Sequence, residues 1–191
     1  MDADSDKPLT AYGFLTVLEN AEHGLFGGYL VLSPQGRPLE FRCSAPIQAS
    51  RAQEILYGPT LRPYLLSEVI GQALVSGAEV AVPIILTDDR DVLPLALLRS
   101  EPVALVESPP HAENPQPANS ALAAVIELGG CRITAPETSG CSAERLHWML
   151  ESLAAHVLLS EPFERIRAAL VEAQLATHEA AESNDDRAAA A

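Results

Sequence analysis

Apolar and polar residues alternate along the first part of the chain as β-strands require, with successive side chains on opposite faces. Apolar runs at 12–18 and 28–32 predict two strands, and strict alternation at 38–45 predicts a third. In the third strand the residues expected to face the core are Leu39, Phe41 and Cys43. Turn-forming residues separate the runs, so we expect an antiparallel three-strand meander, with the Gly27–Gly28 pair in a turn.

Beyond residue 50 the apolar spacing changes to that of a helix. Ser50 and Gln53 form a capping-box pattern, which predicts that a helix begins just after Ser50. A Gly-Pro step at 58–59 interrupts the helix, and an apolar stripe at helical spacing continues beyond it. We therefore predict one kinked helix, or two short ones, over 50–76.

The next part of the chain predicts a parallel pair of strands. Apolar runs at 80–86 and 103–107 have the composition of strands that are covered on both faces. The segment between them, 91–99, is compatible with a short helix or with another strand. We favour the helix, and with it a right-handed parallel crossover.

Composition changes along the chain predict its organisation. The fold class is α/β (α+β), with the meander, the kinked helix, further strands in a mixed sheet and two C-terminal helices. The second half of the chain is expected to pack on the same core, with a separate small lobe as the alternative. The predicted parts are a disordered tail at 1–9, an α/β core at 10–107, a proline-rich linker or loop at 108–120, a β-hairpin with two helices at 121–180, and a disordered tail at 181–191.

The chain is acidic, with a formal net charge of −14 over 191 residues. Nucleic-acid affinity depends mainly on neutralising phosphates, so neither nucleic acid nor an anionic membrane surface is expected as a partner. No apolar run is long enough for a spanning helix, and three cysteines are too few for a disulfide framework, which indicates a cytoplasmic protein. Only 35–66 is basic, with four arginines against two glutamates.

The order of the predicted elements is that of ribonuclease-H-like nucleases. Those enzymes bring carboxylates together around two divalent metals, and one carboxylate comes from the middle of the first strand. Here residues 14–17 hold that place, and none of them can bind magnesium. Asp88 and Asp91 follow the fourth predicted strand, with Glu19 or Glu68 as the remaining carboxylates. We interpret the aspartates as a solvated helix cap, with a degenerate metal site as the alternative.

Cysteine and histidine chemistry is not expected to define a site. The side chains suited to zinc lack the close pairs that zinc sites use; they are Cys131, Cys141, His147 and His156. Cys43, with His23 in an earlier turn, is interpreted as a buried inert thiol rather than a nucleophile. No cofactor is expected, because no nucleotide-binding fingerprint or P-loop occurs.

The basic stretch contains the most distinctive residues. Its glycine-proline break exposes backbone donors, and hydroxyl and guanidinium groups stand beside the break. We interpret this stretch as a candidate surface for a small anion or a peptide, with a purely structural kink as the alternative. The candidate residues are Arg37, Arg42, Tyr57, Thr60, Arg62 and Tyr64.

Three runs of the sequence resemble an uncharacterised bacterial family of hypothetical proteins. They are GRPLEFRCSAP at 36–46, AQEILYGPTLRPYL at 52–65 and SEPFERIRAAL at 160–170. The resemblance covers most of the chain. The family has no assigned activity, substrate or cofactor, so the resemblance implies one coherent protein and no functional residues.

No set of side chains in the sequence can be assigned to a reaction. The leading prediction is therefore a non-catalytic protein-binding or scaffold domain that binds a protein partner or a second copy of itself. The basic stretch and the amphipathic last helix, with its a,d-like spacing, support this prediction. The alternative is a ribonuclease-H-like or phosphate-handling metal-dependent enzyme with a degenerate carboxylate site at Asp88 and Asp91.

Overall fold

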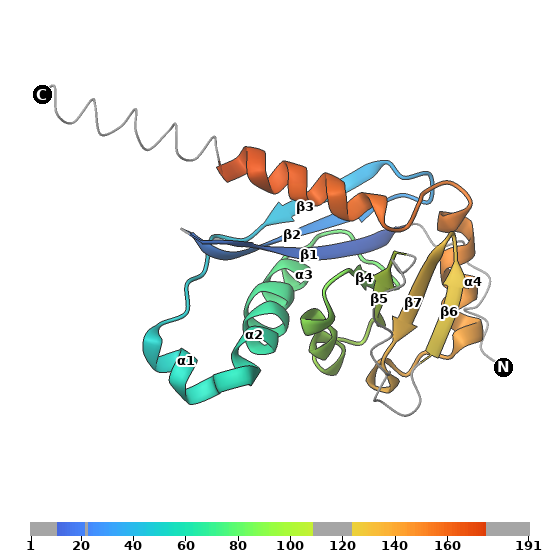
Figure 1. Cartoon of the computed structure of the whole chain (residues 1–191). Helices are drawn as coiled ribbons and strands as arrows, with labels where there is room; N and C mark the ends of the chain where they lie inside the picture. Colours follow the sequence, from blue (N-terminus) through green and yellow to red (C-terminus); the bar gives the residue numbers. More distant parts are fainter. Residues whose placement is uncertain (1–10, 22, 109–123, 175–191) are drawn as a thin grey trace, which may run out of the picture.

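A seven-stranded mixed sheet with helices on both faces forms the body of the protein (Figure 1). The structure is a computed structural model that describes residues 11–21, 23–108 and 124–174; the predicted tails and most of the predicted linker lie outside these residues. The order of the strands is β3-β2-β1-β4-β5-β7-β6, which confirms the predicted mixed-sheet α/β fold. The strands are β1 (Tyr12–Asn20), β2 (Gly24–Leu32), β3 (Pro38–Cys43), β4 (Ile85–Thr87), β5 (Val103–Glu107), β6 (Ala124–Leu128) and β7 (Cys131–Ala135).

The strand pairings confirm the meander and the crossover. β1 pairs antiparallel with β2, and β2 with β3. β4 lies parallel to both β1 and β5, and the connection from β4 to β5 runs through the short 3-10 helix η3 (Arg90–Leu97). The hairpin of β6 and β7 joins the same sheet, because β7 pairs antiparallel with β5.

The predicted kinked helix is one continuous run of five segments. Its capping box is present: the Ser50 hydroxyl accepts the Gln53 N–H, and the Gln53 side chain accepts the Ser50 N–H. The kink falls at Gly58, whose φ is +52°, a conformation that glycine adopts at low cost. A π-helical stretch follows it. The segments are α1 (Arg51–Tyr57), η1 (Gly58–Thr60), α2 (Leu61–Tyr64), η2 (Leu65–Gly71) and α3 (Gln72–Ser76).

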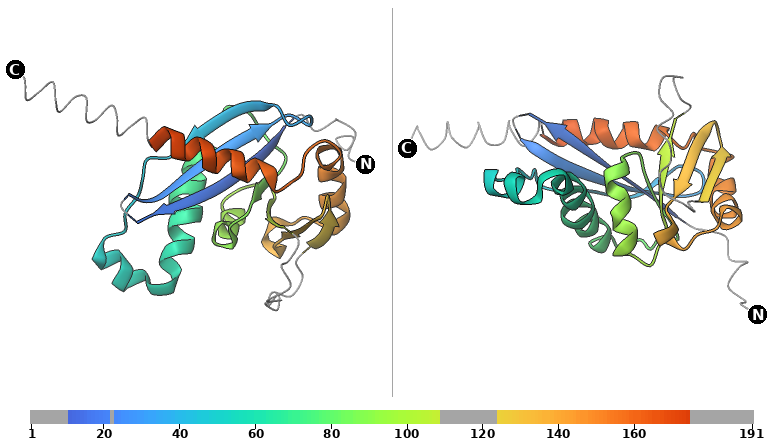
Figure 2. Two further views of the ribbon diagram at one scale, coloured as in Figure 1. Left: turned by 45° about the horizontal axis from the view of Figure 1, so that its top comes forward. Right: turned by 60° about the horizontal axis from the view of Figure 1, so that its bottom comes forward.

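Helices cover the two faces of the sheet in two separate layers (Figure 2). One layer consists of α4 (Ala143–Ala154), which follows the short 3-10 helix η4 (Glu137–Ser139), and of the C-terminal helix at 161–174. The other consists of α2, η2, α3 and η3. The rings of Phe14 and Phe163 meet edge to face at 5.5 Å and fix the C-terminal helix on β1. Within the described residues no helix has the length and apolar character needed to cross a membrane.

Gly27 and Gly28 lie in the middle of β2, not in a turn as predicted. A Cβ on Gly27 would lie 2.3 Å from the Ile70 side chain, and one on Gly28 would lie 2.4 Å from the Ile166 side chain. Since successive strand residues face opposite sides, the pair opens room on both faces at once. Both helical layers can therefore lie close to β2.

The predicted orientation of β3 is wrong. Leu39 and Phe41 are 48% and 41% exposed, and Cys43 is exposed as well, whereas Glu40 and Arg42 between them are partly buried. The reason is Glu40, whose carboxylate accepts the backbone N–H groups of Glu79 and Val80 at 2.9–3.1 Å. This contact ties the loop before β4 to an edge strand.

We expect Glu40→Gln to destabilise the protein in a pH-dependent way. The Val80 N–H holds the pKa of Glu40 below its usual range, although partial burial opposes this. The charged form therefore stabilises the fold above the unfolded-state pKa, and this contribution disappears as pH falls through the folded-state pKa. At neutral pH the free energy of unfolding in urea should drop by about 1–2 kcal/mol.

The difference between wild type and Glu40→Gln should close below about pH 4. The control is Glu79→Gln, which changes an exposed side chain in the same loop and keeps its backbone N–H. A difference that stays constant with pH would show that the Glu40 charge is not what holds the loop.

Candidate functional site

Asp88 is the centre of a polar cluster at the carboxyl ends of β1 and β4. The Thr16 hydroxyl, in the middle of β1, donates to Asp88 Oδ1 at 2.6 Å. Arg167 of the C-terminal helix donates from Nη2 to Asp88 Oδ2. Thr16 is buried on the same face of β1 as Phe14, so its hydroxyl points toward the layer from which Arg167 comes.

Arg62 enters the cluster from α2 in the other layer. Its guanidinium contacts three carboxylates, each through a different nitrogen: Glu19 at 2.7 Å, Asp89 at 3.0 Å and Asp91 at 3.0 Å. Partial burial lowers the pKa of Arg62, but the charges of Asp89 and Glu19 outweigh it and raise the pKa above its usual value. Arg62 therefore remains cationic and holds the end of β1 against the loop after β4.

Local hydrogen bonds fix the loop that carries the aspartates. Asp89 accepts the Asp91 N–H at 2.9 Å and so caps η3, while its own N–H donates to the Thr87 hydroxyl at 3.2 Å. Consecutive residues then face different layers, Asp88 toward Arg167 and Asp89 toward Arg62. We call this set the carboxylate–arginine cluster; its members are Thr16, Glu19, Arg62, Asp88, Asp89, Asp91 and Arg167.

Four of the six candidate binding residues lie together at the kink. The rings of Tyr57 and Tyr64 stack with their centroids 4.8 Å apart, and the Thr60 hydroxyl donates to the Tyr57 carbonyl at 2.8 Å. Hydrogen bonding to Tyr57 raises the pKa of Tyr64. Arg62 lies between these two aromatic residues in the chain, so the kink presents stacked rings beside the carboxylate–arginine cluster.

Arg37 and Arg42 belong to a different part of the sheet. Arg37 is in the turn between β2 and β3, next to the pair Tyr12↔Leu32, whereas Arg62 contacts Glu19 at the opposite end of β1. Arg42 lies 3.6 Å from Glu40 on β3. The basic stretch of the sequence therefore does not form one surface.

The cluster does not have the donor set of a two-metal centre. Asp88 and Asp91 contact different arginines rather than one common point, and Glu68 is exposed on η2. Thr16 supplies a neutral hydroxyl from β1 where such a centre needs a carboxylate. Across the described ranges, no three histidine, cysteine or acidic side chains are grouped so that they could hold a metal.

Sequence reasoning missed Thr16 and Arg167. The one available signal for Thr16 is a polar residue in the middle of an otherwise apolar strand. Arg167 occurs in an ordinary amphipathic helix, and nothing in the sequence connects it to Asp88, 79 positions away. Only the folded chain brings Thr16 and Arg167 to Asp88.

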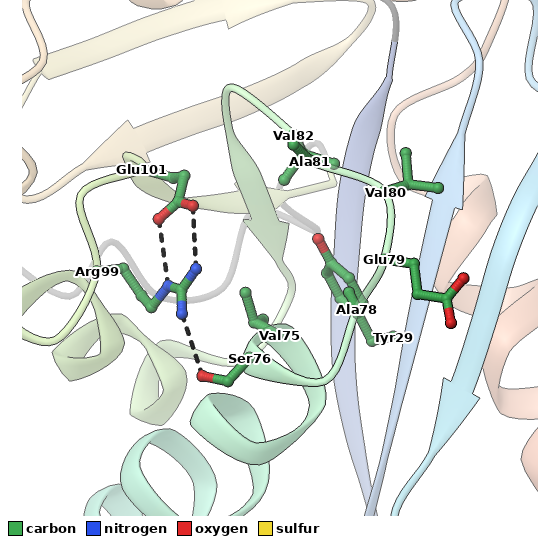
Figure 3. A pocket seen from close by; sticks show the side chains of 10 residues that line it. All are labelled: Tyr29, Val75, Ser76, Ala78, Glu79, Val80, Ala81, Val82, Arg99 and Glu101. Atoms are coloured by element: carbon green, nitrogen blue, oxygen red, sulfur yellow. Dashed lines mark hydrogen bonds and ion pairs between the residues drawn. The ribbon is translucent and has the colours of Figure 1, made fainter.

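A separate cavity of about 270 Å³ lies at the amino ends of β4 and β5, opposite the cluster (Figure 3). Arg99 and Glu101 form a two-point ion pair on one wall, and Arg99 also donates to the Ser76 hydroxyl. Tyr29 also lines the cavity, and its buried hydroxyl has no hydrogen-bond partner in the described structure. Burial raises the pKa of Tyr29, and the charges of Glu101 and Glu40 add to this effect. The phenol therefore stays neutral.

Comparison with known proteins finds similarity among solved structures only. No family profile and no curated protein sequence matches the chain. Ciona intestinalis endonuclease V, in complex with a 24-mer DNA containing an inosine followed by a ribo-adenosine, is 11% identical with a TM-score of 0.52, over 86% of this chain and 87% of that one. The catalytic domain of human endonuclease V is 18% identical with a TM-score of 0.49, over 89% of each chain. What this chain shares with these proteins is the fold.

These similarities correct two predictions. The prediction of a non-catalytic protein-binding or scaffold domain is contradicted by the fold shared with the Ciona endonuclease V, and the alternative of a ribonuclease-H-like or phosphate-handling enzyme agrees with that fold better. The expectation that nucleic acid is not a partner conflicts with the Ciona structure of the same fold, which is a complex with DNA. That expectation rested on total charge, which does not reveal the two arginines that the fold brings to one edge.

We expect Thr16→Val to destabilise the protein by about 1–3 kcal/mol, because Asp88 Oδ1 loses its donor inside a partly buried cluster. Valine keeps the shape of threonine, so packing is nearly unchanged. Urea unfolding measures the loss, and Thr134→Val in β7, half-buried and away from the cluster, is the control. Equal stability losses in the two variants would show that the hydrogen bond to Asp88 has no special role.

Proposed function

We propose that this chain acts on nucleic acid and binds the phosphodiester backbone of a strand at the carboxylate–arginine cluster. The observation that carries the proposal is that Arg62 and Arg167, from opposite layers, contact the consecutive residues Asp89 and Asp88 at the carboxyl ends of parallel strands. Ligands of open α/β sheets bind at this end of the strands. The DNA complex of the structurally similar Ciona endonuclease V agrees with this choice of ligand.

Arg167 keeps guanidinium nitrogens available for a phosphate, whereas each nitrogen of Arg62 already contacts a carboxylate. The side chains of Arg62 and Arg167 are 42% and 41% exposed, so neither is enclosed by its carboxylate partners. In the described structure only Nη2 of Arg167 is engaged, by Asp88, which leaves the other edge of the guanidinium open to a phosphate oxygen. Guanidinium groups fixed in this way can also stabilise charge that develops on phosphate oxygens during a reaction.

The kinked helix adds a surface suited to bases. Helix α1 buries none of its residues, and Ile55 and Leu56 at its end are exposed next to the Tyr57–Tyr64 stack. Aromatic rings commonly hold an unpaired strand by stacking, because every base has a flat apolar face. We therefore expect single-stranded nucleic acid to bind better than a duplex.

The acidic character of the chain limits the affinity. The carboxylates of the cluster repel a phosphate, so a strand must compete with Glu19 and Asp88 for the guanidinium groups. Binding should be weak and should depend on salt, with the logarithm of the affinity falling by about 1.4 per decade of salt for two single-strand phosphates.

The test is binding of a fluorescein-labelled single strand with the inosine–ribo-adenosine sequence, measured by fluorescence anisotropy, together with a gel assay for cleavage. Arg167→Gln should weaken binding by about tenfold or more, through loss of a charged hydrogen bond. Arg132→Gln, which removes an exposed arginine in the β6–β7 hairpin, should leave binding unchanged. The proposal is overturned by finding neither binding nor cleavage at low salt, or by equal effects of the two substitutions.

A further inference from the structure

We infer that guanidinium groups, and not divalent cations, pair with the carboxylates at this edge of the sheet, so that the carboxylate–arginine cluster binds a phosphodiester without a metal ion. The identity of the phosphodiester ligand rests on the proposed function. The inference that Asp88 does not bind a divalent cation is independent of the proposed function, because it involves no nucleic acid.

Both carboxylate oxygens of Asp88 already have hydrogen-bond donors. One carboxylate oxygen accepts the Thr16 hydroxyl, and the other accepts the Arg167 guanidinium. Asp88 itself is largely buried, with 16% of its side chain exposed. A cation that bound Asp88 would have to displace a charged and positioned partner, and the displaced Arg167 would lose its only carboxylate among the described residues.

The residue of β1 that contacts Asp88 is a threonine and not a second carboxylate. A divalent cation such as Mg²⁺ binds oxygen ligands and is usually held by one or two carboxylates. Thr16 lies within hydrogen-bond distance of Asp88, at the place where a second carboxylate would complete such a pair. Its hydroxyl carries no charge and already donates its proton to Asp88, so the pair is a carboxylate and a donor rather than two carboxylates.

The remaining acidic side chains of the cluster all pair with Arg62. Arg62 holds Glu19, Asp89 and Asp91 with three separate nitrogens, and Asp89 also accepts the Asp91 N–H. These carboxylates are therefore directed at a guanidinium in the other layer and not at Asp88. Each side of the edge therefore has one guanidinium group held by carboxylates. A phosphate that binds here contacts Arg62 and Arg167 without an intervening metal ion.

The experiment is a comparison of thermal unfolding of the full-length chain in millimolar Mn²⁺ and in EDTA. A ligand that binds the folded state raises the unfolding temperature. We expect wild type to differ by less than about 1 °C between the two conditions, because both oxygens of Asp88 already accept hydrogen bonds from Thr16 and Arg167. A rise in Mn²⁺ that is absent in Asp88→Asn would overturn the inference.

The inference is also tested by a variant that is designed to bind metal beside Asp88. The double variant Thr16→Asp with Arg167→Met puts a second carboxylate beside Asp88 and removes the guanidinium, so Mn²⁺ should now stabilise the protein. Arg132→Met is the matched control and should respond as wild type does. A folded double variant with no response to Mn²⁺ would overturn the inference.

A second measurement keeps the inference testable if the double variant does not fold. Anisotropy with the labelled single strand should give dissociation constants for wild type in EDTA and in Mg²⁺ that agree within about twofold. Binding that requires Mg²⁺ would support the proposed function and overturn this inference. Absence of binding in both buffers would refute the proposed function and leave the Mn²⁺ result as the test of metal at Asp88.

Discussion

The contact of Asp88 with Thr16 and Arg167 is the interaction on which the candidate site depends. It joins the central strand β1, the loop after β4 and the C-terminal helix, three segments that are distant in sequence. A carboxylate that is partly buried must be paired or hydrogen-bonded, because burial of an isolated charge is costly. The two partners of Asp88 meet this requirement and, in doing so, fix where an arginine stands at the edge of the sheet.

The sheet makes this contact possible through two glycines. Gly27 and Gly28 leave room for Ile70 on one face and Ile166 on the other, so both helical layers approach β2 closely. The close approach places α2 and the C-terminal helix where their arginines can reach opposite sides of one loop. In this fold, which Ciona endonuclease V shares, the edge at the carboxyl ends of β1 and β4 has arginine–carboxylate pairs instead of a set of convergent carboxylates.

Local signals predicted most of the fold, and long-range contacts account for what they missed. The capping box at Ser50, the alternation of apolar residues and the glycine-proline break each depend on neighbours in sequence, and all appear in the structure. The orientation of β3 depends on Glu40 reaching residues 79–80, which no periodicity encodes. The aspartates could be found from their place after a strand, whereas Arg167 could not, because helical spacing does not show which strand end a helix will reach.

The most direct test of the account is a crystal structure of the full-length protein grown in Mn²⁺, with anomalous diffraction used to locate the metal. The account predicts that Arg167 and Thr16 contact Asp88 in that structure and that no manganese peak lies within coordination distance of Asp88. A manganese ion bound to Asp88, with Arg167 turned away, would contradict the claim that a guanidinium serves as the cation at this edge.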